Sequence, residues 1–172
     1  MTMRGLIAEV DDGEQLWACT VRRMLRTRSM KERHPVTVGD EVRFARVGIT
    51  GEEGRIAIGE RELPEGVIEE VAPRRTTLLR EYGGRVQVVA ANVDQAVIVV
   101  AAEMPTLRPH LIDRYLVAAH QGDMRPVVCV NKADLDVSGG AAVVVERYTK
   151  LGYRSLLTSV VDGQGLERLR EL

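Results

Sequence analysis

The chain has 172 residues, of which 45% are hydrophobic and 28% charged, and its formal net charge is −1 at pH 7. This composition suits one large domain or two small ones with packed cores, and near neutrality gives no argument for nucleic-acid binding from bulk basicity. The longest apolar runs, 96–102 and 127–130, are too short to span a membrane, and the N-terminus lacks a signal-peptide apolar region, so we expect a cytoplasmic protein.

The first 75 residues are predicted to form short strands separated by turns. The expected strands are 5–10, 15–22, 40–47, 55–58 and 66–72. Between the first two, Asp11-Asp12-Gly13-Glu14 has the chemistry of a hairpin turn, because Asp and Gly accept a positive φ. About five short strands in some seventy residues favour a small β barrel, and we expect residues 1–75 to form an OB-fold domain that binds RNA or the ribosome.

A cationic segment lies between the second and third predicted strands. Its basic residues, set against the single acid Glu32, are Arg22, Arg23, Arg26, Arg28, Lys31 and Arg33. Clustered arginines suit phosphate groups through bidentate hydrogen bonds, so we expect an RNA contact here; a merely solvated loop is the alternative. Trp17 and Phe44 are more often core residues than a stacking platform, which favours structured RNA over a single strand.

A linker is expected at residues 76–85, and the pattern then changes. Residues 86–172 are predicted to alternate strands and helices. The expected strands are 85–91, 96–102, 127–130 and 153–159, and the expected helices are 106–121, 140–151 and one from residue 166 onward. This alternation predicts a parallel sheet with helical crossovers, and therefore an α/β domain.

The apolar run 127–130 ends in Asn131-Lys132-Ala133-Asp134, which we interpret as a guanine-binding motif. In open α/β sheets the ligand lies beyond the carboxyl ends of the strands. The Asp134 carboxylate can accept from the N1–H and 2-amino groups of guanine, whereas adenine offers neither. Asn131 can bond to the other base edge, and the Lys132 stem can lie along the ring. The alternative is that these four residues bind no ligand and only connect the strand to the following loop.

The sequence predicts no metal centre and no disulfide. His34, His110 and His120 have no cysteine or carboxylate cluster at ligand spacing. Cys19 and Cys129 lie far apart inside strand-like runs, where a single buried thiol is usual. No Gly-Lys pair occurs in the chain, so the phosphate cradle Gly-x-x-x-x-Gly-Lys-Ser/Thr is absent from these residues.

A barrel followed by a G domain that begins with its base-binding motif resembles the circularly permuted GTPases of the ribosome small-subunit-dependent GTPase A family. The resemblance covers essentially the whole chain and implies a partial circularly permuted P-loop GTPase domain with a parallel sheet. The segments that carry it are Ala91 to Gln95, Ile112 to Ala119, Asn131 to Leu135 and Gly163 to Leu166.

The resemblance also assigns roles to residues. It implies that Asn131, Lys132 and Asp134 bind guanine, and that Thr158-Ser159-Val160 is a second base-contacting loop that offers a backbone N–H to the guanine O6. The family usually has Ser-Ala at this point, so Val160 is a departure. The resemblance further implies that these residues are the N-terminal part of a longer GTPase, whose continuation carries the phosphate loop, a magnesium-binding switch and a zinc-binding module.

Three functions remain open from the sequence. The first, implied by the resemblance, is a monomeric ribosome-associated GTPase that hydrolyses GTP to GDP in late maturation of the small (30S) subunit, with 16S rRNA as partner. This chain alone holds no catalytic residue and is expected not to hydrolyse GTP, because it lacks the phosphate cradle. The second is an RNA- or ribosome-binding module without nucleotide hydrolysis. The third is an unrelated α/β protein with a chance motif.

Overall fold

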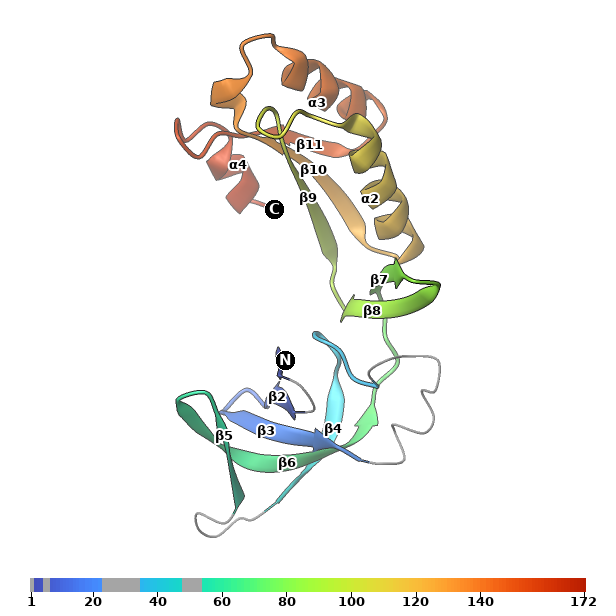
Figure 1. Cartoon of the computed structure of the whole chain (residues 1–172), viewed down its shortest axis with the longest axis vertical. Helices are drawn as coiled ribbons and strands as arrows, with labels where there is room; N and C mark the ends of the chain where they lie inside the picture. The colour runs from blue at the N-terminus through green and yellow to red at the C-terminus, as the bar shows by residue number, and fades with distance from the viewer. Residues whose placement is uncertain (1, 5–6, 23–34, 48–53) are drawn as a thin grey trace. The chain divides into compact units, whose positions relative to one another are not determined.

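The computed structural model of the chain describes residues 2–4, 7–22, 35–47 and 54–172. Two compact units are present, Met1–Val93 and Asp94–Leu172. The first is built on strands, and the second alternates strands with helices (Figure 1). The change from strands alone to alternating strands and helices is the one that the sequence predicts, but the two units meet at Val93 and Asp94 rather than at the expected linker, 76–85.

The first unit is organised by a six-stranded mixed sheet. Its strands are β1 (Thr2–Arg4), β2 (Ile7–Asp11), β3 (Leu16–Val21), β4 (Val42–Arg46), β5 (Arg55–Ile58) and β6 (Arg61–Val71). The order is β1-β2-β3-β6-β4, β5 also pairs with β6, and only β3 and β6 run parallel. The long strand β6 therefore pairs with three other strands, β3, β4 and β5.

The core of this unit lies against β3 and β6. Trp17, Cys19 and Ile68 are buried there, and the ring of Trp17 lies 5.5 Å from that of Phe44. Gly66 allows the close approach of these side chains, because a Cβ at this position would lie 2.6 Å from the Cys19 sulfur. The glycine in the middle of β6 therefore has a packing role.

The five strands predicted for this unit are confirmed, with β6 beginning at Arg61 rather than at residue 66. Among the described residues the sheet is open, with β1 and β4 at its ends, so the closed barrel that the strand count favours is not seen there. Strand count and spacing predict β content, but closure depends on pairing between strands far apart in the sequence.

Residues 76–85, expected to be a linker, contain a strand. β7 (Thr77–Tyr82) pairs antiparallel with β8 (Arg85–Ala91). Gly83 and Gly84 join them with φ values of 59° and 73°, as a two-residue hairpin turn requires. The glycine pair thus forms a tight turn inside the expected linker, and the two units divide between Val93 and Asp94.

This hairpin is tied to the segment before β4 by a buried ion pair. The Asp40 side chain is fully buried and accepts from Arg74 Nε and Nη2 at 2.7 and 3.0 Å and from the Thr37 N–H at 2.8 Å. Asn92, at the end of β8, donates its side-chain amide to the Gly39 carbonyl at 2.9 Å. These bonds fix the end of the hairpin to the rest of the first unit.

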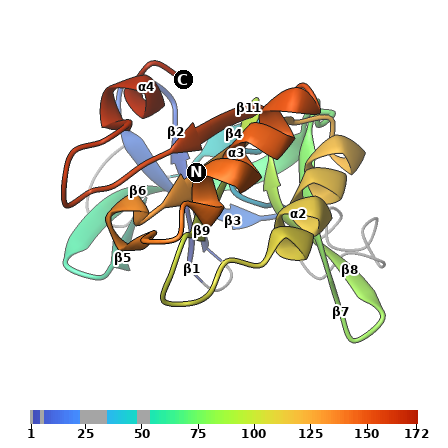
Figure 2. The same cartoon turned by 90° about the horizontal axis from the view of Figure 1, so that it is seen from above.

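The second unit contains a parallel sheet in the order β11-β10-β9. Its strands are β9 (Gln95–Ala101), β10 (Arg125–Asn131) and β11 (Arg154–Leu157). Its helices are α2 (Pro109–Gln121), the 3₁₀ turn η2 (Ala133–Leu135), α3 (Gly140–Lys150) and α4 (Leu166–Arg170). Helices α2 and α3 lie side by side (Figure 2). The predicted α/β alternation and parallel sheet are confirmed.

Even-numbered side chains of β9 and β10 pack against α2 and α3, because alternate strand residues share a face. Ile98 and Val128 meet Ile112 of α2 and Tyr148 of α3 in one buried cluster. The Tyr148 hydroxyl donates to Asp113 Oδ1 at 2.7 Å and also lies 3.0 Å from the Pro109 carbonyl. Burial and the hydrogen bond to Asp113 raise the pKa of Tyr148 to about 12. Tyr148 therefore links the two helices through its ring and its hydroxyl.

Replacing Tyr148 by Phe keeps the packed ring but removes the donor to Asp113. We expect the free energy of unfolding near neutral pH to fall by about 1 kcal/mol, measured by urea denaturation. Tyr115→Phe, at an exposed tyrosine of α2, is the matched control and should change it by less than about 0.5 kcal/mol. Equal effects of the two substitutions would contradict the linking role.

The raised pKa also predicts a pH dependence. The unfolded chain releases the Tyr148 proton near pH 10, and the folded chain holds it until about pH 12. The stabilisation is therefore complete below about pH 10 and is lost as the pH rises toward 12. Between these values, Tyr148→Phe should lose less stability than the native chain or Tyr115→Phe. If the free energy of unfolding changes with pH in the same way in all three proteins, Tyr148 does not cause the pH dependence.

Candidate functional site

The polar end of β10, the central strand of the parallel sheet, forms the centre of the candidate site. Val130 is fully buried, and Asn131, the last residue of the strand, is partly exposed. The Asn131 carbonyl accepts from the Ala102 N–H at 2.7 Å, which fixes it to the end of β9. Lys132 then adopts a left-handed conformation with φ 62°, and the chain turns into η2, which carries Asp134.

Strand β11 delivers the second part of the site beside the first. Thr158 and Ser159 follow this strand and are buried, with exposed fractions of 1% and 0%. The Thr158 N–H donates to the Val130 carbonyl at 2.8 Å, and the Ala133 N–H donates to the Thr158 carbonyl at 3.0 Å. Backbone hydrogen bonds thus continue past the end of the sheet and hold together the segments that follow β10 and β11.

Two side-chain hydrogen bonds join the residues at the carboxyl end of β10 to those at the carboxyl end of β11. Thr158 Oγ1 donates to Asn131 Oδ1 at 3.1 Å, and Ser159 Oγ donates to Asp134 Oδ1 at 2.7 Å. Within the described part of the chain, Asn131 Nδ2 and Asp134 Oδ2 make no hydrogen bond. The site can therefore offer one amide donor and one carboxylate acceptor to a ligand.

Lys132 extends from this cluster toward the end of β9. Its ammonium donates to the carbonyl of Met104, in the loop between β9 and α2. The side chain is neither fully buried nor fully exposed. This bond holds the Lys132 ammonium at the loop between β9 and α2.

The loop after Ser159 is held closed by its own hydrogen bonds. The Ser159 N–H donates to the Gln164 carbonyl at 3.0 Å, and the Asp162 N–H donates to Ser159 Oγ at 3.1 Å. Gly165 has φ 71°, and a Cβ there would lie 2.3 Å from the Leu157 carbonyl oxygen. Among the described residues the N–H of Val160 has no hydrogen-bond acceptor.

The structure therefore brings four predicted residues, Asn131, Asp134, Thr158 and Ser159, into one hydrogen-bonded cluster with Lys132 and Val160 beside it. Sequence reasoning missed two contacts, the Met104 carbonyl under the Lys132 ammonium and the Gln164 carbonyl that holds Ser159. The glycines around Gln164 signalled a turn, but nothing in the sequence pointed to Met104.

The cationic segment is described only at its first residue. Arg22 pairs with Glu69 at 2.9 Å, and Arg43 of β4 pairs with Glu69 and Glu70 at 3.0 and 2.8 Å. These acids raise the pKa of Arg43. Arg23, Arg26, Arg28, Lys31 and Arg33 lie outside the described residues. The neighbouring described surface of the sheet is thus balanced in charge.

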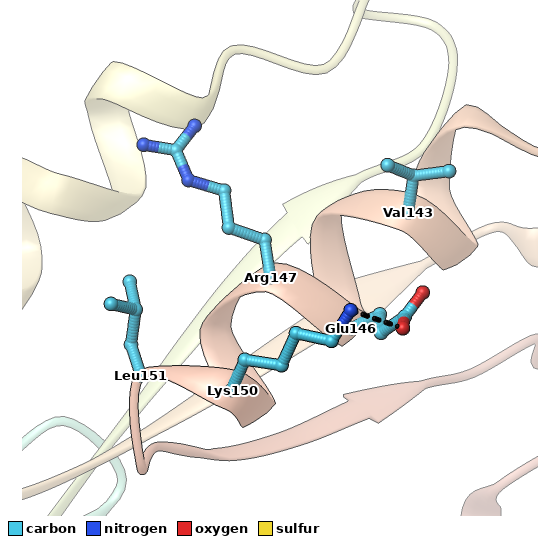
Figure 3. A pocket seen from close by; sticks show the side chains of 5 residues that line it. All are labelled: Val143, Glu146, Arg147, Lys150 and Leu151. Atoms are coloured by element: carbon cyan, nitrogen blue, oxygen red, sulfur yellow. Dashed lines mark ion pairs between the residues drawn. The ribbon is translucent and has the colours of Figure 1, made fainter.

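An open depression on the outer side of α3 contains none of the predicted site residues. It is lined by Val143, Glu146, Arg147, Lys150 and Leu151 (Figure 3). Glu146 and Lys150 form an ion pair at 2.7 Å one helical turn apart, which lowers the pKa of Glu146. These are features of a solvated helix surface.

Cys19 and Cys129 are free and buried, and burial raises the pKa of Cys19 to about 12. The described ranges contain no group of three or more His, Cys, Asp or Glu residues that could hold a metal ion. No described helix has the length and apolar character needed to cross a membrane.

The sequence model of the RsgA GTPase family matches residues 71–172. Among curated relatives named small ribosomal subunit biogenesis GTPase RsgA, the protein of Chlorobaculum tepidum is 38% identical over 80% of this chain and 43% of its own length. That of Histophilus somni is 34% identical over 100% of this chain and 45% of its own length. The chain thus spans less than half the length of these relatives.

Two solved structures are similar over nearly the whole chain. YjeQ from Thermotoga maritima has a TM-score of 0.65 and 30% identity, over 96% of this chain and 51% of that one. YloQ, described as a circularly permuted GTPase, has a TM-score of 0.57 and 28% identity, over 94% of this chain and 49% of that one. The likeness therefore includes both units.

The geometry of the loop predicts different consequences for two neighbouring glycines. Gly163→Ala places a side chain at φ 76° in open space and should destabilise the fold by about 1 kcal/mol through backbone strain. Gly165→Ala adds a clash with the Leu157 carbonyl and should destabilise it by at least about 1 kcal/mol more. Urea denaturation measures both, and equal losses would contradict the described loop.

Proposed function

The chain belongs to the RsgA GTPase family, and from this membership we propose that it carries the guanine-recognition part of a GTPase that acts in late maturation of the small ribosomal subunit and converts GTP to GDP. The observation that carries the proposal is the pairing of Ser159 with Asp134 and of Thr158 with Asn131 at the carboxyl ends of β10 and β11. In parallel sheets this edge is where ligands bind.

The paired groups suit the edge of guanine. The Asp134 carboxylate has lone pairs left after the bond from Ser159, and these can accept from the guanine N1–H and 2-amino groups. Asn131 Oδ1 accepts from Thr158, which leaves the Asn131 amide hydrogens to the N7 side of the base. The Val160 N–H can donate to O6. Adenine presents an acceptor at N1 and no 2-amino group, so it would leave Asp134 unpaired.

GTP hydrolysis is not expected from these residues alone. The 172 residues contain no Gly-Lys pair and therefore no standard phosphate cradle. The described residues include no ligand set that fits Mg²⁺ or Zn²⁺, the metals that the family resemblance implies, so no step is assigned to either. We expect weak binding of GTP or GDP, because phosphate contacts supply much of the affinity for nucleotides.

We further propose that residues 1–75 form an OB-fold that docks on 16S rRNA through the cationic segment Arg22 to Arg33, in a monomeric cytoplasmic protein. The open mixed sheet of the described residues is compatible with an OB-fold, which is a partly open barrel. Arg22 and Arg43 are paired with Glu69, so the proposed contact rests on the remaining basic residues of the segment.

Substituting Asp134 by Asn tests the guanine assignment. The amide cannot accept from both guanine donors but can donate to the 2-oxo group of xanthine, so affinity for GMP should fall about tenfold and that for XMP should rise. NMR titration of the 172-residue chain measures both. Asp162→Asn, in the neighbouring loop, makes the same charge change and should leave the preference unaltered. If Asp134→Asn keeps the guanine preference of the native chain, Asp134 is not the residue that recognises the base.

Reversing Arg26 and Arg28 to Glu tests RNA docking. Binding to small ribosomal subunits should weaken, and its dependence on salt should flatten by about one unit of slope per lost phosphate contact. The double variant Arg114→Glu/Arg168→Glu, at exposed arginines of α2 and α4, makes the same change in net charge and should have little effect. If the slope and the melting temperature of the double variant both match the native chain, the segment is a solvated loop, and docking must be sought elsewhere on the first unit.

A further inference from the structure

A buried thiol lies behind the polar cluster at the carboxyl end of β10. Cys129 and Asn131 are two residues apart on this strand, so their side chains share one face of the sheet. The Cys129 sulfur lies 3.4 Å from the Thr158 hydroxyl oxygen, and the same hydroxyl donates to Asn131 Oδ1 at 3.1 Å. The three side chains thus form one chain of hydrogen bonds that runs from the core to the partly exposed Asn131 amide.

The chemistry of these groups sets the direction of the chain of bonds. A hydroxyl carries one hydrogen and the amide oxygen of Asn131 only accepts, so the Thr158 hydrogen is committed to Asn131. The Thr158 oxygen is then left to accept from the Cys129 thiol, which is a weak donor. Cys129 and Thr158 are exposed to only 2% and 1%, so solvent does not compete for these bonds.

The reverse direction would turn the Asn131 amide around. If the Thr158 hydroxyl donated to the sulfur, its oxygen would accept from the Asn131 amide hydrogens, and the Asn131 oxygen would face the ligand. We propose that Cys129 is a positioning residue that acts through Thr158: its thiol keeps the hydroxyl hydrogen on Asn131 Oδ1 and leaves the amide hydrogens to the N7 side of the base. This role rests on the proposed guanine function. A turned amide would lose the bond to N7, which is an acceptor.

Substitution of Cys129 separates the hydrogen bond from packing. Cys129→Val keeps an apolar side chain of similar size but removes the donor, and Cys129→Ala removes both. Each should lower the GMP affinity of the 172-residue chain by about twofold to fivefold in an NMR titration, because a thiol is a weak donor. Cys19→Ala, at a buried thiol in the core of the first unit, is the matched control and should leave the affinity unchanged. Full affinity in Cys129→Val with reduced affinity in Cys129→Ala would mean that the thiol only fills space, which would overturn the proposal.

The side-chain amide of Asn131 gives a readout that needs no nucleotide. In proton–nitrogen correlation spectra of the free chain, its two hydrogen signals should shift or broaden in Cys129→Val, because the amide then samples both orientations. Cys19→Ala should leave them unchanged. If these signals are the same in the native chain and in both Cys129 variants, the thiol does not orient the amide, and guanine recognition stands without it.

Thr158→Val tests whether Cys129 acts through Thr158. Valine keeps the shape of threonine without the hydroxyl, so adding Cys129→Ala to this variant should lower the GMP affinity no further. Losses that add up would contradict the chain of bonds. If the backbone amides of Asn131 and Asp134 do not shift in the native chain at millimolar GMP, the guanine function is wrong, and the proposed role of Cys129 in it is wrong as well.

Discussion

The hydrogen bond from Ser159 Oγ to Asp134 Oδ1 is the interaction on which the proposed site depends. It joins two loops that leave neighbouring parallel strands, and it fixes one oxygen of an exposed carboxylate that would otherwise rotate freely. The parallel bond from Thr158 to Asn131 sets the orientation of the amide in the same way. Both donors are buried side chains, so the groups proposed to bind the base are held in place by the protein itself.

The sheet explains why these loops meet. Parallel pairing of β10 with β11 places both carboxyl ends at one edge, and β9 fixes the Asn131 carbonyl from the other side. Helices α2 and α3 hold the sheet through the core around Tyr148. The site is therefore built on the most buried strand of the unit, and its polar residues begin where burial ends.

Apolar runs, helical spacing and turn residues were sufficient to predict the strands and helices of the second unit and the parallel sheet. The four-residue motif after β10 also predicted where polar groups gather. The contacts of Lys132 with Met104 and of Ser159 with Gln164 could not be predicted, because they join backbone carbonyls that carry no sequence signal. In the first unit, local patterns predicted the strands but not whether the sheet closes into a barrel. Residues 76–85, expected to be a linker, instead form most of a hairpin with β8.

The most direct test of guanine recognition is a crystal structure of the chain with GMP at millimolar concentration. The account predicts that the guanine N1–H and 2-amino groups bond to the Asp134 carboxylate while Ser159 Oγ keeps its bond to the same group. A base bound elsewhere, or an Asp134 side chain turned away from Ser159 to reach it, would contradict the account.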